Sequence, residues 1–139
     1  MIKDFFCFSG IQLIDTIIIQ DNPLLDLPLP FNLFQNLNPL KYLHLENNFI
    51  QAPTTSPPNN PLFSKIPNIE YLSLKGNPIR KITKDFFKLL AESKLNELDL
   101  ENCFLETIEE GALDQLTDLR KVDFSMNYKL LQVLTVLKI

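Results

Sequence analysis

An eleven-residue pattern returns five times along this chain, and it constrains the fold more than any other feature. Its clearest copy runs from 40 to 50 and reads L-x-x-L-x-L-x-x-N-x-I. The copies begin at Ile14, Leu40, Ile69, Leu95 and Leu119, with spacings of 26, 29, 26 and 24 residues. Periods of this length are typical of solenoids, because one repeat cannot bury its apolar face alone. We therefore expect residues 1–139 to form one domain of about five stacked coils.

Within each copy, the L-x-L core alternates apolar and polar residues with a period of two. This alternation predicts a short strand with one buried face, at 16–20, 42–46, 71–75, 97–101 and 121–125. Strands about 25 residues apart are too distant for hairpins, so we expect them to pair in parallel. A bulky apolar residue precedes each copy and is expected to close the back of the same core. These residues are Phe8, Phe34, Phe63, Phe87 and Leu113.

The five copies together resemble the leucine-rich-repeat family over about residues 8 to 133. They are most similar to the roughly 24-residue type of animal extracellular receptors and adhesion proteins, such as Toll-like receptors. The resemblance implies an α/β, mostly β, solenoid wound as a right-handed superhelix. A short parallel β-sheet would line its concave face, and irregular or short helical segments its convex face.

One polar position recurs where each predicted strand ends, and the resemblance implies a buried ladder of hydrogen bonds there. A side-chain amide can both donate to and accept from the backbone groups that the turn leaves unpaired. The cysteine in the fourth copy is expected to be a buried member of this ladder rather than a reactive thiol. The ladder residues are Asn22, Asn48, Asn77, Cys103 and Asn127.

Two segments between the strands have distinct compositions. Residues 51–61 hold four prolines, which remove backbone donors and block helix formation. We expect a solvated loop insertion there, which explains the longest spacing. Residues 84–95 have a helix-compatible composition and are predicted to form a helical turn or two on the convex side.

The composition excludes most chemistry. A net charge of -4 and a pI of about 4.9, with scattered Lys and Arg, argue against nucleic acid binding. A single histidine, His44, and two cysteines, Cys7 and Cys103, leave no catalytic or zinc-binding constellation. No acidic spacing matches a calcium loop. We therefore expect no enzyme activity, cofactor or metal, and no membrane insertion by this segment.

Binding of a protein ligand is the remaining function, and the concave face would carry it. Polar side chains between the buried leucines should point outward, where tyrosines suit an interface. We hypothesise that Tyr42 and Tyr71 anchor the ligand and that the acidic residues steer a basic region of it. Alternatively, this face is only solvated. The candidate contacts are Tyr42, His44, Tyr71, Ser73, Lys75, Glu97, Asp99, Glu101, Lys121 and Asp123.

The ends of the chain bear on its context. Solenoid ends normally need caps, and the apolar residues 130–139 stop partway through a coil. We therefore expect a fragment of a longer cell-surface or extracellular receptor or adhesion ectodomain, with self-association through uncapped ends. The cytoplasmic alternative is a scaffold or regulatory subunit that docks an enzyme, since no N-x-Ser/Thr glycosylation acceptor is present. The start at Met1 matches a signal peptide weakly, and Cys7 is most simply a core residue.

Overall fold

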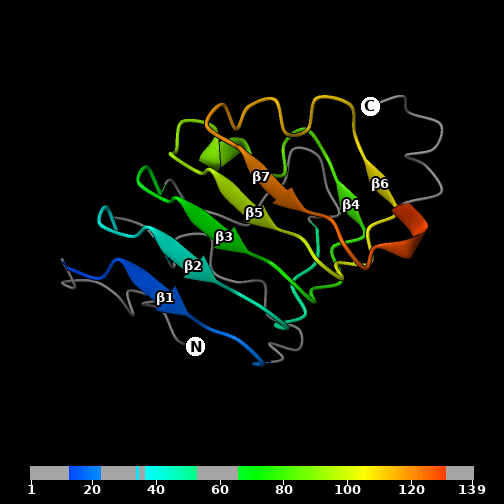
Figure 1. Ribbon diagram of the computed structural model, residues 1–139, viewed down its shortest axis with the longest axis horizontal. Helices are drawn as coiled ribbons and strands as arrows, with labels where there is room; N and C mark the ends of the chain where they lie inside the picture. Colours follow the sequence, from blue (N-terminus) through cyan, green and yellow to red (C-terminus); the bar gives the residue numbers. More distant parts are fainter. Residues whose placement is uncertain (1–12, 23–33, 35–36, 53–65, 131–139) are drawn as a thin grey trace, which may run out of the picture.

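A computed structural model describes residues 13–22, 34, 37–52 and 66–130 of the chain. Its main element is a five-stranded, all-parallel sheet with the strand order β1-β2-β3-β5-β7 (Figure 1). Successive coils contribute one strand each, as the repeat spacing predicts. The strands are β1 (Thr16–Ile18), β2 (Tyr42–His44), β3 (Tyr71–Ser73), β5 (Glu97–Asp99) and β7 (Lys121–Asp123).

Each strand begins at the predicted residue and ends two residues before the predicted end. Pairing between coils nevertheless continues past the strands. Leu45 N–H donates to Ser73 O at 3.0 Å, and Asn47 N–H donates to Lys75 O at 3.0 Å. The turn that follows each strand therefore stays bonded to the next coil, which fixes the register of the whole stack.

The inner face of the sheet forms one continuous apolar column. Leu43, Leu72 and Leu98 are register partners on neighbouring strands, and all three are buried. Phe34 and Phe87 close the back of this core as predicted and are also buried, whereas Leu113 is partly buried against it. The corresponding Phe8 and Phe63 lie outside the described residues. Because each coil contributes leucines to its neighbours, burial is shared along the stack.

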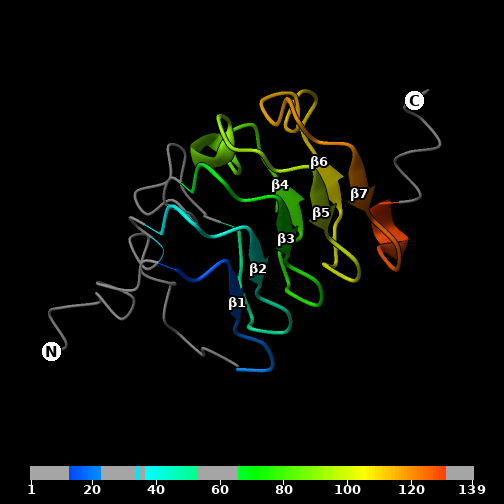
Figure 2. The same cartoon turned by 60° about the vertical axis from the view of Figure 1, so that its left-hand side comes forward.

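The opposite side of the coil has less regular structure. It holds the 3₁₀ helix η1 (Lys88–Leu90) and a two-stranded parallel sheet of β4 (Lys81–Ile82) and β6 (Thr107–Ile108). Figure 2 shows the coils stacked in sequence order. The predicted fold class, a mostly β leucine-rich-repeat solenoid with short helical segments opposite the sheet, is confirmed. The second sheet was not predicted, and most of the proline-rich loop lies outside the described residues.

Asparagine side chains connect the coils where the chain leaves the sheet. Asn77 is fully buried, and its Oδ1 accepts from Asn48 N–H at 2.9 Å and from Ile50 N–H at 3.0 Å. Its Nδ2 donates to Leu45 O at 2.8 Å and to Leu74 O at 2.7 Å. One side chain thus satisfies four backbone groups in two coils.

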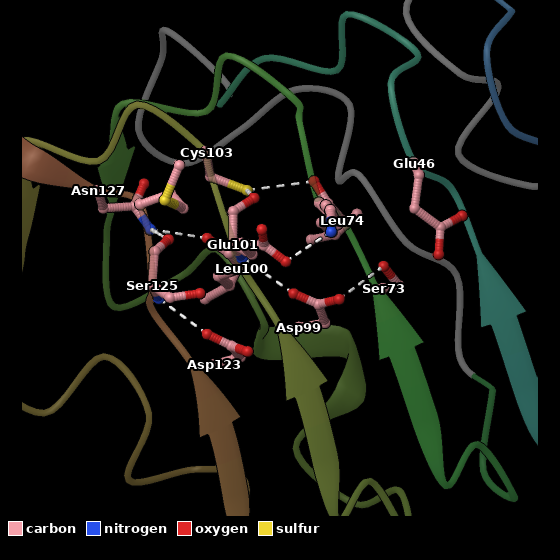
Figure 3. A network of polar contacts seen from close by, with 12 residues as sticks. Glu46, Ser73, Leu74, Asp99, Leu100, Glu101, Cys103, Asp123, Ser125 and Asn127 are labelled. Atoms are coloured by element: carbon pink, nitrogen blue, oxygen red, sulfur yellow. Dashed lines mark hydrogen bonds and ion pairs between the residues drawn. The ribbon is translucent and has the colours of Figure 1, made fainter.

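The other ladder residues vary this arrangement. Asn48 and Asn127 are buried, and Asn127 Nδ2 donates to Leu100 O at 2.8 Å (Figure 3). Asn22, in the first described coil, is exposed and donates to Gln20 O. Cys103 Sγ lies 3.1 Å from Leu74 O, so the thiol replaces the donor side of an asparagine. Asn77 N–H and Ile79 N–H bond within their own coil instead.

No helix in the part of the chain that the structure describes is long and apolar enough to cross a membrane.

Candidate functional site

The outward side of the five-stranded sheet, which we call the concave face, displays three rows of side chains that run across the strands. Pairing places Tyr42 beside Tyr71 in the first row and His44 beside Ser73 in the central row. The first row is Thr16, Tyr42, Tyr71, Glu97 and Lys121. The central row is Ile18, His44, Ser73, Asp99 and Asp123. The third row follows the strand ends and is Gln20, Glu46, Lys75, Glu101 and Ser125.

One end of this face is apolar and aromatic, and we call it the aromatic area (Ile18, Tyr42, His44 and Tyr71). Ile18 is 61% exposed and Tyr42 is 39% exposed, although both sit on strands. The rings of His44 and Tyr71 lie 5.0 Å apart between centroids with a tilt of 39°. Partial burial, above all other causes, raises the pKa of Tyr71, so its hydroxyl stays protonated. The area therefore offers apolar surface with fixed polar groups at its rim.

His44 is oriented by a carboxylate from the same strand end. Its Nδ1 lies 3.0 Å from Glu46 Oε1, and the Glu46 side chain is only 16% exposed. Glu46 Oε2 is enclosed and has no hydrogen-bond partner among the described residues. His44 is thus held in place on the concave face by Glu46. A general base needs a nucleophile within hydrogen-bond reach, and Glu46 is not one that the imidazole could activate.

The other end of the face is acidic, and we call it the acidic area (Asp99, Glu101 and Asp123; Figure 3). Carboxylate oxygens of these residues lie within 4.8 Å of one another. Asp99 Oδ1 accepts from Glu101 N–H at 2.9 Å, and Asp123 Oδ1 accepts from Ser125 N–H at 2.8 Å. Hydrogen bonds from Ser125 lower the pKa of Asp123. These backbone bonds hold the carboxylates of Asp99 and Asp123 in place.

The lysines of the face form ion pairs at its borders. Lys75 Nζ lies 2.6 Å from Glu101 Oε2, and Lys121 Nζ lies 3.0 Å from Glu97 Oε2. These contacts raise the pKa of both lysines. Among the described residues, no lysine or arginine nitrogen lies within 4.0 Å of an Asp99 or Asp123 carboxylate oxygen. The carboxylates at the centre of the acidic area therefore have no direct ion-pair partner among the described residues.

The prediction that Ser73 is exposed on the concave face is wrong. Ser73 occupies the expected place in the central row, but it is fully buried. Its Oγ lies 3.4 Å from Asp99 Oδ2. The side chain is short, and the larger Tyr71 and Asp99 stand beside it, so a partner cannot reach it. Ile18 is the opposite case, since it is prominently exposed although the predicted contacts omit it.

The carboxylates of the acidic area form the one group of three potential metal ligands within the described residues. A calcium ion takes six to eight oxygens, and oxygens of Asp99, Glu101 and Asp123 already accept hydrogen bonds or an ion pair. The expectation that no metal is bound stays a prediction.

Cys103 is a structural residue in this geometry. Its side chain is fully buried in the ladder, and burial raises the pKa of the thiol to about 12. Because the thiolate is the reactive form, the folded chain keeps this sulfur inert near neutral pH. The hydrogen bond from the Cys103 thiol to Leu74 O explains why a cysteine can stand at this ladder position, with no redox role required.

Two relatives resemble this chain in sequence. Chaoptin of Drosophila melanogaster is 34% identical over 95 residues, which cover 68% of this chain. Chaoptin of Tribolium castaneum is 30% identical over 105 residues, which cover 74% of it. The chain spans only 7% and 12% of the lengths of these two proteins. No family model matches the chain, and no solved structure matches it.

Proposed function

We propose that this chain, which belongs to the leucine-rich-repeat family, is a protein-binding segment of a cell-surface receptor or adhesion ectodomain. Its ligand is a protein that docks on the concave face. The aromatic area anchors this ligand, and the acidic area steers it during encounter.

The observation that carries this proposal is the exposed apolar surface on strands whose register is fixed. Ile18 and Tyr42 lie on neighbouring strands and present apolar side chains to solvent. Contiguous exposed apolar groups with a polar rim are typical of interaction sites. Tyrosines contribute large contact area at low conformational cost. The sheet backbone holds them rigidly, so little order has to be gained on binding.

A cell-surface setting is supported by the relatives. Chaoptin is a leucine-rich-repeat cell-adhesion protein, and the similarity covers about 70% of this chain. The repeat length of 24 to 29 residues also suits the extracellular type. The chain covers a small part of chaoptin, so the adhesion role of the whole protein is transferred here as a proposal.

Alanine at both tyrosines of the aromatic area tests the proposal. For a partner isolated with the wild-type chain, we expect Tyr42→Ala/Tyr71→Ala to weaken binding by about tenfold or more, because central aromatic contacts dominate interface energies. Surface plasmon resonance of purified proteins measures this change.

A matched control uses the third tyrosine of the chain. Tyr128 is 67% exposed and lies outside the concave face, so Tyr128→Ala should leave the dissociation constant unchanged. Circular dichroism should show both variants folded. An unchanged affinity for the Tyr42/Tyr71 variant would remove the concave face as the docking surface.

A further inference from the structure

The central row of the concave face changes its chemistry from one end to the other. Ile18 presents an exposed apolar side chain on β1, and Asp99 and Asp123 present carboxylates on β5 and β7. Between them lie His44, whose side chain is 30% exposed, and Ser73, which is fully buried and leaves the row low in the middle. The row is therefore an apolar contact and an acidic contact separated by a shallow stretch.

The flanking rows limit what can lie along this track. Near its acidic end, Glu97 pairs with Lys121 on one side and Lys75 pairs with Glu101 on the other. These pairs neutralise the borders and leave the central Asp99 and Asp123 without a lysine or arginine within 4.0 Å among the described residues. Lys75 and Lys121 act on the central carboxylates only at longer range. The carboxylates that remain open to a direct ion pair with a partner therefore lie in the central row.

The spacing of the two contacts selects the conformation of the partner. Neighbouring strands are about 4.8 Å apart, so the step from between β1 and β2 to between β5 and β7 is about 14 Å. In an extended chain this distance corresponds to about four residues, which return to the same side. In a helix it corresponds to about nine residues, which place the two side chains on opposite faces.

We propose that the partner presents an extended segment with an apolar and a basic side chain four residues apart. This inference rests on the proposed docking on the concave face and specifies the chemistry of the ligand. The apolar side chain covers Ile18 and Tyr42. The basic one, best an arginine, bridges Asp99 and Asp123, whose like charges it compensates with fork-shaped hydrogen bonding.

Defined peptides test this pairing without the natural partner. The parent probe is a capped nonapeptide of serine and threonine with one leucine and, four positions on, one arginine. Three companions replace the arginine by glutamate, replace the leucine by serine, or move the arginine to two positions from the leucine. Each is titrated into the isotope-labelled full chain at low ionic strength, and amide chemical shifts are followed by NMR.

We expect the parent probe to shift amides of β1 and β2 together with those of β5 and β7. The glutamate companion should bind about tenfold more weakly or not at all, because it meets the carboxylates with like charge. The serine companion should lose the shifts at β1 and β2, and the short-spaced companion should contact one end only. Absence of parent binding, or equal binding of the parent and glutamate peptides, would overturn the proposal.

Charge-removing variants of the chain locate the basic contact. Asp99→Asn/Asp123→Asn keeps the side-chain oxygens that accept from Glu101 and Ser125 N–H. This variant should bind the parent probe about tenfold more weakly than the wild type does. It should bind the glutamate companion equally well or more tightly, because the like charges are removed.

The control Glu92→Gln/Asp114→Asn removes the same net charge from exposed residues away from the sheet and should bind as the wild type does. Equal effects of both variants would show that only net charge matters and would overturn the assignment. If the Tyr42/Tyr71 variant loses the natural partner while these peptides fail, docking on the concave face stands and the proposed ligand chemistry falls.

Discussion

Asn77→Ala is expected to destabilise the folded chain by about 3–5 kcal/mol, because it removes partners from several buried groups at once. The amide accepts from Asn48 and Ile50 N–H and donates to Leu45 and Leu74 O, all in the interior. Each buried backbone group left without a partner costs about 1–3 kcal/mol. Leu74 O would still accept a hydrogen bond from the Cys103 thiol. The total loss is therefore smaller than the sum of the costs for all four backbone groups. Urea denaturation followed by circular dichroism measures the change in unfolding free energy.

The matched control for this ladder position is Asn22→Ala. Asn22 occupies the same place in its repeat, but it is exposed and donates to Gln20 O beside it. Its loss should cost less than about 1 kcal/mol, since an exposed hydrogen bond is replaced by water. Equal destabilisation by the two substitutions would mean that Asn77 contributes only its local turn and that the ladder does not join the coils.

Leu72→Ala is expected to cost about 3–4 kcal/mol in unfolding free energy. Leu72 is fully buried on β3, and its register partners are Leu43 and Leu98. Truncation there removes apolar contacts in three coils and leaves a cavity that the flanking strands cannot fill, because the ladder fixes their spacing. The same denaturation experiment measures it.

Leu13→Ala is the control for burial, because Leu13 is 92% exposed. That change should stay within about 0.5 kcal/mol of the wild type, as surface substitutions usually do. Were Leu72→Ala as mild as Leu13→Ala, the central coil would not be packed against both neighbours.

The repeat pattern was sufficient to predict the sheet, because alternation and period are properties of the sequence. Parallel pairing follows from strands that are too far apart for hairpins, and the five strand starts were predicted to the residue. The ends were placed two residues too far. Polar residues such as Lys75 leave the strand conformation, yet the Lys75 carbonyl still accepts from Asn47 N–H of the preceding coil. Alternation of apolar and polar residues does not distinguish these two states.

The pairing of β4 with β6 was beyond sequence reasoning. Each of these strands has two residues, with Ile82 paired to Ile108, and two residues are too few to show an alternation of apolar and polar side chains. Ile82 is buried and Ile108 partly buried, so tertiary packing brings these segments together. Their pairing depends on the neighbouring coil and not on local preference.

For the candidate site, the sequence predicted which residues form the rows, but not how exposed each side chain is. The order of residues in a row does not tell which side chains are covered by their neighbours. The buried Ser73 was therefore predicted to contact the ligand, and the exposed Ile18 was not. Ion pairs such as Lys75 with Glu101 depend on rotamers, which decide where charge remains uncompensated. Alternation alone places a residue on a face and does not measure its exposure.

The central claim, that the coils stack in parallel with one register, is tested most directly by disulfide trapping. Tyr71 and Glu97 are register partners, whereas Tyr71 and Lys121 are separated by the intervening strand. Bridged residues need Cα atoms closer than about 7 Å, and two strand steps span about 10 Å. In a Cys7→Ser background with Cys103 buried, Tyr71→Cys/Glu97→Cys should oxidise rapidly to a bridge seen by mass spectrometry, and Tyr71→Cys/Lys121→Cys should not. Bridging of the second pair with no bridging of the first would contradict the parallel stack.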